Sequence, residues 1–421
     1  ALTRQLRERY PAFAELVNPR PPALTELAHL LAPGEAFMAF LTTADRTYGW
    51  ATDRAGKVDF FASDLGETKL AQIVTRLRRT LDADQWTGSL PPPFDLASAQ
   101  QVFMELLAPT RRVWQDHPDL VVAASGPLGS LPFALLPAGS LADPEPKAAE
   151  KPAGPWLIAS HSITQTASAA AFVALRSAPR SSGERPPFLG FGDPDYAAAP
   201  TSSAAPEPDA PYGEALPWRE YRKLPRLPET RDEILAIAAA LQTDPAGSTF
   251  FGRDASRARV QRADLSRRRV VAFATHGLVP GDLPGLDQPA LALAGGGDGK
   301  ESPLLTLGDV LGLRLDADWV VLSACNTASP DAAGAEAVSG LGRGFFYAGT
   351  RAVLVTHWAV ETESATLLVS EVFRNYAKPD VSRAQALRLA QLKVMQQSGK
   401  QRRFAHPAYW AGYALVGDGG R

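Results

Sequence analysis

The chain has 421 residues, and its 43 basic side chains nearly balance its 45 acidic ones. This balance excludes the basic surplus expected of a nucleic-acid-binding protein, and the sequence holds neither an apolar run long enough to cross a bilayer nor a signal peptide. A single cysteine excludes an intrachain disulfide and a multi-cysteine metal site. We therefore expect a folded cytoplasmic protein of two or three domains, or one large duplicated unit, with no cofactor or metal and no direct nucleic-acid or membrane partner.

The first half opens with a helical segment over residues 1–29. Apolar runs with Asp and Gly turn residues between them then predict a series of strands. The predicted elements are strands at Ala36–Thr42, Thr47–Thr52 and Val58–Ala62, a helix around Thr68–Leu81, and short strands at Leu120–Ser125 and Phe188–Phe191.

Two stretches rich in Pro and Ala interrupt this pattern, at Pro137–Pro155 and Asp195–Gly213. They contain too little apolar surface to offset the entropy lost on ordering, which predicts exposed linkers. We place the main division in the second linker. The predicted units are then a helical segment over 1–29, a first half over 30–212 and a second half over 213–421.

The second half alternates strands and helices more regularly. Thr230 and Glu233 form the Thr-x-x-Glu pattern of a capping box ahead of an amphipathic helix. Uninterrupted apolar strands alternating with amphipathic helices predict an α/β fold with a mainly parallel sheet covered on both faces. The predicted strands are Val270–Thr275, Trp319–Ser323 and Ala352–Thr356, and the helices are Ala335–Ala348, Ser364–Tyr376 and Ser382–Gln396.

Polar or reactive side chains follow each of these three strands. The first strand leads into His276 and Gly277, the second into Cys325, and the third into His357 and Trp358. Ligands of open α/β sheets bind beyond the carboxyl ends of the strands. We therefore expect all three strand ends to open on the same edge of the sheet.

His276 and Cys325 fit a cysteine nucleophile and its proton partner. A free thiol titrates near pH ~8.5, so a neighbouring imidazole is needed to accept its proton at neutral pH. Attack on a peptide carbonyl leaves an oxyanion, for which the backbone N–H groups of Gly277 and Cys325 are candidate donors. The alternative is that Cys325 is a small core side chain and His276 a hydrogen-bonded structural residue. Spacing alone leaves both interpretations open.

The segments around these two residues resemble the two signature segments of the CHAT family. These are caspase-like domains usually attached to tetratricopeptide repeats and distantly similar to separase and caspases, in which the His also lies about 50 residues before the Cys. The resemblance rests on VAFATHG at Val271–Gly277 and WVVLSACNT at Trp319–Thr327, and it extends over roughly residues 30–418. Further matching segments are Leu128–Leu136, Leu304–Thr306, Val355–Val360, Gln385–Arg388 and His406–Gly412.

The resemblance implies a caspase-hemoglobinase fold and a cysteine endopeptidase with His276 as general base, Cys325 as nucleophile and Gly277 as an oxyanion donor. It also implies that the first half is a degenerate caspase-like unit, and the strand that ends before Gly126 does carry neither Cys nor His. The implied partners are a specific protein substrate, such as a pore-forming or regulatory protein, and an activating repeat domain or subunit. The implied setting is bacterial defence or cell-death signalling. The alternative is a catalytically silent scaffold or interaction module.

Four further residues are candidates for the walls of the substrate cleft. Trp358 and His357 follow the third strand, with core packing as the alternative. Asp287 and Glu361 lie around the predicted mouth, where an acid could select a basic substrate residue, and solvated surface acids are the alternative. The glycine-rich Gly295–Lys300 does not fit a phosphate-binding loop, because Ala and Glu flank it where that motif needs Gly and Ser or Thr.

Overall fold

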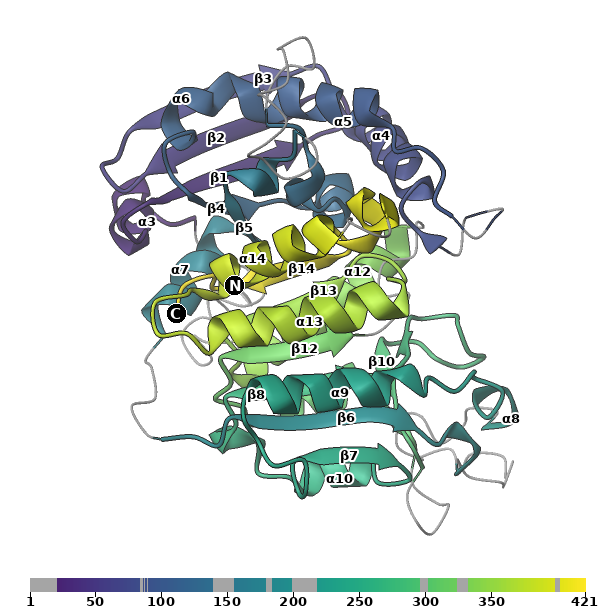
Figure 1. Cartoon of the computed structure of the whole chain (residues 1–421). Coiled ribbons are helices and arrows are strands. Elements are labelled where there is room, and N and C mark those ends of the chain that lie inside the picture. Colours follow the sequence, from purple (N-terminus) through teal and green to yellow (C-terminus); the bar gives the residue numbers. More distant parts are fainter. Residues whose placement is uncertain are drawn as a thin grey trace, which may run out of the picture.

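The computed structural model of the chain describes residues 21–83, 86, 88, 90–138, 155–178, 184–198, 218–295, 302–323, 332–397 and 402–421, with only the backbone of 332–339 and 402–403 (Figure 1). Residues 1–20, most of both predicted linkers, most of the glycine-rich segment and Cys325 lie outside the described residues. None of the described helices is long and apolar enough to cross a membrane.

Most of the described strands, from both halves, join into one large sheet. Its eleven strands run in the order β3-β2-β1-β4-β5-β14-β13-β12-β8-β6-β7. The strands β1, β4 and β5 pair in parallel, and so do β13, β12, β8, β6 and β7. The hairpin strands β2 and β3 are antiparallel, as is β14 against β13. The bounds are β1 Glu35–Thr42, β2 Thr47–Asp53, β3 Val58–Ser63, β4 Asp119–Ala123, β5 Ser162–Thr166, β6 Phe188–Pro194, β7 Thr249–Gly252, β8 Val270–Ala274, β12 Trp319–Ser323, β13 Ala352–Thr356 and β14 Tyr413–Gly417.

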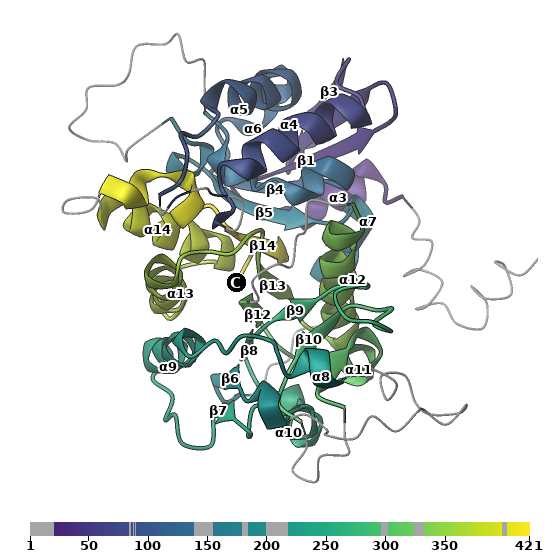
Figure 2. The same cartoon turned by 90° about the vertical axis from the view of Figure 1, so that its right-hand side faces the viewer.

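Helices cover both faces of this sheet (Figure 2). Along β8, Ala272 belongs to the apolar cluster beneath α9, α13 and α14, whereas its neighbour Phe273 belongs to the cluster beneath α10, α11 and α12. Successive side chains of a strand point to opposite faces, so a strand between two helical layers must be apolar throughout. The bounds are α9 Glu229–Ala240, α10 Arg257–Arg262, α11 Leu307–Gly312, α12 Ala332–Ala348, α13 Thr362–Tyr376 and α14 Arg383–Gln396.

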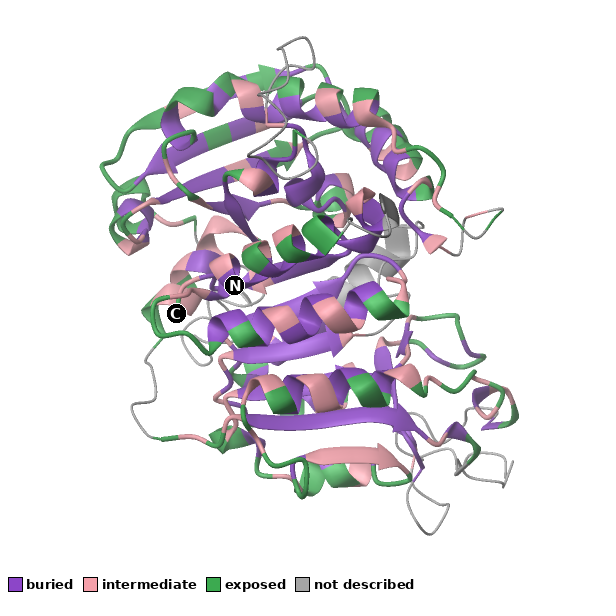
Figure 3. Ribbon diagram, viewed as in Figure 1, coloured by how far each residue is buried: buried purple, intermediate pink, exposed green. Residues whose placement is uncertain are grey.

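The first half repeats this layering. The helices α4 and α5 pack on one face of its strands, and α3 and α7 pack on the other. The larger apolar cluster runs without interruption from α4 to α13, so the two halves share a core. Figure 3 shows the resulting band of buried strands between half-exposed helices. The bounds are α3 Leu24–Leu30, α4 Glu67–Arg79, α5 Leu96–Val102, α6 Arg111–Trp114 and α7 Ala169–Ser177.

The predicted mainly parallel α/β fold is confirmed, and the sheet order places one strand differently from the predicted division. The strand β6 precedes the second linker, yet it pairs with β8 and β7. A boundary after residue 212 therefore separates β6 from both strands to which it is hydrogen-bonded. At the other end of the chain, β14 lies between β13 and β5, and its parallel pairing with β5 is registered at Val416 and Gln165.

Buried charges strengthen the junction between the halves. Arg176 of α7 contacts Glu35 at 2.7 Å and also Asp418, which follows β14. Arg383 at the start of α14 contacts the same Asp418 carboxylate at 3.0 Å, and its side chain is 1% exposed. The two halves are thus held by shared ion pairs as well as by a shared core.

The predicted capping box of α9 is wrong. The helix begins at Glu229 after Pro228, and no side chain caps it. Thr230 instead donates from its hydroxyl to the Leu227 carbonyl at 2.6 Å and accepts the Asp193 N–H at 2.8 Å. Glu233 is turned into the core, where its carboxylate accepts a hydrogen bond from Ser323.

Candidate active site

The strand ends predicted to carry the chemistry do lie on one edge of the sheet. In β8 and β12, Ala274 is paired with Ser323, and the Thr275 N–H donates to the Ser323 carbonyl at 3.2 Å. His276 is therefore the second residue beyond this paired position. On the other side of β12, β13 runs in the same direction and ends before His357.

The His276 ring is half-buried and held by a backbone carbonyl. Its Nε2 lies 2.8 Å from the carbonyl oxygen of Pro225, which can only accept a hydrogen bond. The proton of the neutral ring is therefore on Nε2, and the lone pair of Nδ1 is left to take a proton. Burial lowers the pKa of His276, while the Pro225 carbonyl and Glu229 raise it. The balance favours the neutral ring that a general base requires.

Tyr196 supports the same ring from another side. The Tyr196 and His276 rings lie 5.4 Å apart between centroids at an interplanar angle of 39°. The Tyr196 hydroxyl is 2.9 Å from that of Thr275, whose hydroxyl donates to the Ala292 carbonyl. Burial raises the pKa of Tyr196 to about 12, so it stays a neutral hydrogen-bonding group at ordinary pH.

Gly277 begins the edge strand of a small second sheet in the order β11-β10-β9. Its strands are β9 Gly277–Leu278, β10 Ala290–Ala292 and β11 Leu304–Thr306. Gly277 lies opposite Leu291, and the Ala292 N–H donates to the His276 carbonyl at 2.9 Å. In an antiparallel ladder this makes Gly277 and Leu291 a pair that exchanges no hydrogen bonds, so the Gly277 N–H points away from β10.

A buried polar cluster lies under the end of β12, where sequence patterns gave no sign of it. The Ser323 hydroxyl donates to Glu233 Oε2 at 2.9 Å and is 3.2 Å from the Tyr413 hydroxyl. Burial raises the pKa of Glu233 to about 7, and its Oε1 has no hydrogen-bond partner among the described residues. The signal in the sequence was misleading, because a Glu three residues after a Thr fits a capping box equally well.

His357 and Trp358 are packed inside the protein, which is the alternative to their predicted place in the cleft. Trp358 is 1% exposed, and its Nε1 donates to the Ala408 carbonyl at 3.0 Å. His357 is 6% exposed, burial lowers its pKa to about 3, and its carbonyl accepts from Arg78 at 2.6 Å. Neither side chain lines an accessible surface in this structure.

The two predicted acidic cleft residues lie on different elements. Asp287 is exposed in the segment before β10. Glu361 is half-buried at the start of α13, where it accepts the Ser364 N–H at 2.9 Å and so caps the helix. The choice of Asp287 as a selector of basic substrate residues stays a prediction. No group of three or more His, Cys, Asp and Glu side chains in the described part of the chain could hold a metal ion.

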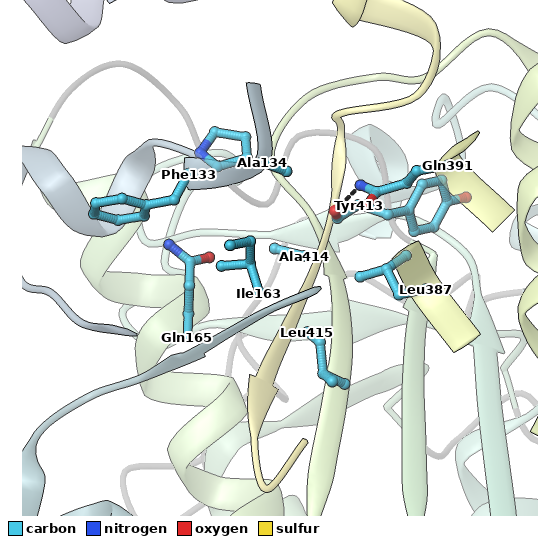
Figure 4. Close-up of a pocket in the computed structure, with 10 residues that line it drawn as sticks. Phe133, Ala134, Ile163, Gln165, Leu387, Gln391, Tyr413, Ala414 and Leu415 are labelled. Carbon is cyan, nitrogen blue, oxygen red and sulfur yellow. Dashed lines mark hydrogen bonds between the residues drawn. The ribbon is translucent and has the colours of Figure 1, made fainter. Parts of the chain in front are cut away.

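A small pocket lies at the junction of the two halves (Figure 4), and its lining includes Tyr413, whose hydroxyl contacts Ser323. Its lining comes from η5 (Phe133–Leu135) and the proline before it, and from β5, α14 and β14, and it includes no carboxylate, imidazole or thiol. Within it, Gln391 Nε2 donates to the carbonyls of Trp410 and Tyr413 at 3.1 and 3.2 Å. The pocket is structural packing rather than a reactive site.

The sequence model of the CHAT domain matches residues 96–418, which is most of the chain. This chain belongs to the CHAT domain family. The match starts after β3, whereas the signature segments in the sequence predict a resemblance that begins near residue 30.

Curated relatives of this CHAT domain are much longer proteins. Tetratricopeptide repeat protein 28 of Mus musculus is 35% identical over 118 residues, and its Homo sapiens counterpart is 32% identical over 118 residues. The match covers 27% of this chain and 4% of either relative. This chain therefore spans a small part of the length of those relatives.

Among solved structures, the separase of the Saccharomyces cerevisiae separase-securin complex is similar to this chain with a TM-score of 0.52. The similarity covers 97% of this chain and 31% of the separase chain, at 8% sequence identity. It shows that the two share a fold. Together with the family match, it confirms the caspase-like α/β architecture expected from the sequence.

Proposed function

We propose that this CHAT domain is a cysteine endopeptidase in which Cys325 is the nucleophile and His276 the general base. The observation that carries the proposal is the state of His276 at the end of β8. Its ring is neutral by burial, and the Pro225 carbonyl holds the ring proton on Nε2, so that Nδ1 can accept a proton from a thiol. Family membership supports the same assignment.

Chain connectivity supports bringing the thiol to that base. Cys325 is the second residue after Ser323 in the sequence, as His276 is after Ala274, and Ser323 and Ala274 are paired. Two trans peptide units span at most about 7.6 Å between Cα atoms. The two residues therefore follow neighbouring points on one edge of the sheet, which allows their side chains to meet.

The proposed reaction passes through an acyl-enzyme. The Cys325 thiol gives its proton to Nδ1 of His276, and the thiolate bonds to the scissile carbonyl carbon. The N–H groups of Gly277 and Cys325 stabilise the resulting oxyanion. His276 then protonates the leaving amine as the C–N bond breaks. Water attacks the thioester, with His276 again taking and returning a proton, and the free acid and Cys325 thiol are restored.

We further propose that a repeat domain or subunit controls access of a protein substrate to this site. Two relatives are named for tetratricopeptide repeats, and this chain corresponds to a small fraction of their length. Helical repeats present extended concave surfaces suited to holding a partner protein. A repeat partner would select the protein substrate. The four predicted cleft residues give little basis for that selection by themselves.

The test is cleavage of a proteome-derived peptide library, read by mass spectrometry, by the wild type and by Cys325→Ala and His276→Ala. We expect the wild type to cut at a defined residue type and both variants to lose at least about 10³-fold in rate. Ser125→Ala, at the exposed end of the corresponding strand β4, is the matched control and should cut normally. Full cleavage by Cys325→Ala would contradict the proposal, and biological effect without any cleavage would favour a scaffold.

A further inference from the structure

The chain leaves β6 through an irregular step at Asp193. Its φ of 43° lies in the left-handed region, which few residues other than glycine adopt. The pairing of β6 with β7 shifts register between Gly192 and Pro194, an irregularity of the kind found at β-bulges. Bulges turn a side chain toward a particular target, and such backbone conformations persist only where surrounding contacts hold them.

The polar contacts of Asp193 go to the segment that leads into α9 and to the first turn of that helix. Its carboxylate is 5% exposed, and its Oδ1 accepts from both Nε and the terminal nitrogen of Arg226, at 3.1 and 2.6 Å. Arg231 lies 3.5 Å from the other carboxylate oxygen. The Asp193 N–H donates to the Thr230 hydroxyl. A single residue thus ties the end of β6 to three positions of one segment.

That segment holds His276. The carbonyl that accepts the Nε2 proton of His276 belongs to Pro225, whose peptide bond continues directly into Arg226. Fixing the Arg226 side chain on Asp193 therefore limits where the Pro225 carbonyl can lie. The irregular step at Asp193 also sets the path of the chain toward Tyr196, three residues further along the sequence. The Tyr196 ring packs on the His276 ring. Asp193 therefore helps to place both the Pro225 carbonyl and Tyr196, the two groups that orient the His276 ring.

We propose that Asp193 is a positioning residue for His276, acting through Arg226 and the Pro225 carbonyl. The proposal rests on the proposed function for its effect on catalysis, but its effect on the His276 ring is independent of activity. Comparable Asp–Arg pairs in this protein lie elsewhere. Asp318, before β12, contacts Arg185 at 2.8 Å and Arg269 at 3.2 Å at the opposite end of the same strands.

This second bridged aspartate provides the matched control. Asp193→Asn keeps the size of the side chain and removes the charge that holds Arg226, and Asp318→Asn does the same at the far edge. We expect Asp193→Asn to lower kcat on the order of 10²-fold with little change in KM, because a displacement of about 1 Å at a catalytic group has effects of that size. Asp318→Asn should leave kcat unchanged even if it lowers stability.

The state of the ring can be measured directly by NMR of protein with ¹⁵N-labelled histidine. The sequence has six histidines, and the His276 signals are those missing in His276→Gln. In the wild type and in Asp318→Asn, we expect the neutral ring to carry its proton on Nε2. In Asp193→Asn, we expect the proton to be shared between Nε2 and Nδ1, since the carbonyl is no longer fixed.

These readouts separate the two proposals. An unchanged ring signal in Asp193→Asn, with or without a loss of kcat, would overturn the positioning role. A changed ring signal in a protein that cuts no peptide would support the role of Asp193 and contradict the endopeptidase. If Asp193→Asn does not fold, Arg226→Ala tests the same link, because the Arg226 side chain is 52% exposed. It should shift the ring signal as well, and a signal identical to the wild type would overturn the proposal.

Discussion

The strands β4 and β8 are similar in burial and pairing but are followed by different residues. Both are parallel strands whose side chains are almost all buried. Beyond β4 the chain passes through Ser125 and turns at Gly126 into the short helix η4, Gly126–Ser130. Beyond β8 it presents Thr275 and His276, with a carbonyl and a tyrosine already in place around the imidazole. The sheet therefore fixes where each strand ends, and the two or three residues after the strand determine whether a titratable side chain lies there.

The same difference appears one layer below the strand ends. In the first half, Gln165 of β5 donates from Nε2 to the Leu131 carbonyl at 3.1 Å and so ties β5 to the loop that follows β4. In the second half, the buried carboxyl group of Glu233 accepts a hydrogen bond from Ser323 at the end of β12. The buried side chain near the end of β5 is thus a neutral amide, whereas the one near the end of β12 is a titratable carboxyl group.

The comparison assumes that the two halves are one folding unit, and Arg383 is the residue to test this. Arg383→Ala should lower the free energy of unfolding by about 3–5 kcal/mol, because it leaves the buried Asp418 without one of its partners. Chemical denaturation should still show a single transition. Arg374→Ala, which removes an exposed pair with Glu371, is the control and should cost under about 1 kcal/mol. Two separate transitions, of which only one moves, would show that the halves unfold independently.

A smaller effect is expected at Glu233, where stability should depend on pH. Its pKa is about 7 in the folded protein against an ordinary 4.5, so the folded state keeps a proton that the unfolded state releases. Stability from this group is therefore complete below pH ~4.5, falls by up to about 3 kcal/mol as pH rises to about 7, and is level above that. Glu233→Gln should lack this fall. The measurement is urea denaturation from pH 5 to 8 with the exposed Glu220→Gln as control, and an equal fall in both variants would contradict the assignment.

The smallest effect belongs to the first half. Gln165→Leu removes one hydrogen bond to Leu131 and should cost about 1 kcal/mol. Because no charge is involved, the cost should be the same from pH 5 to 8, which the same denaturation series would check. A pH-dependent cost would mean that the two strand ends are less different than their side chains indicate.

The strands and helices could be predicted from sequence because each has an unambiguous pattern. Val270–Ala274 is apolar at every position since helices cover both faces, and α13 carries its apolar stripe at helical spacing. The placement of β6 could not be predicted, because the partner of a parallel strand depends on the path of the crossover and not on the strand's own residues. Its short apolar run suits either half of the sheet.

The site was predictable only where a residue type carries the chemistry. His276 could be singled out because it is followed by Gly277 at one strand end while the only cysteine follows a second strand, in segments that resemble the CHAT family. The Pro225 carbonyl could not be found this way, since every residue has a backbone acceptor. Trp358 was ambiguous for the opposite reason: a large aromatic side chain fits a cleft wall and a core equally well, and here the core was the outcome. Cys325 lies outside the described residues, and its role stays a prediction.

The position of β14 has a consequence for synthesis of the protein. The ribosome makes β5 and β13 first, and β14 follows both, yet it is the strand that lies between them. Until it emerges, each half has an open strand edge at the place where the halves will meet, and unpaired edges attract other strands. Arg383 and Arg176 also lack their shared ion-pair partner until Asp418, directly after β14, has been synthesised. The two halves of the sheet can therefore join only after β14 has been synthesised, so an incomplete chain lacks the strand that connects them.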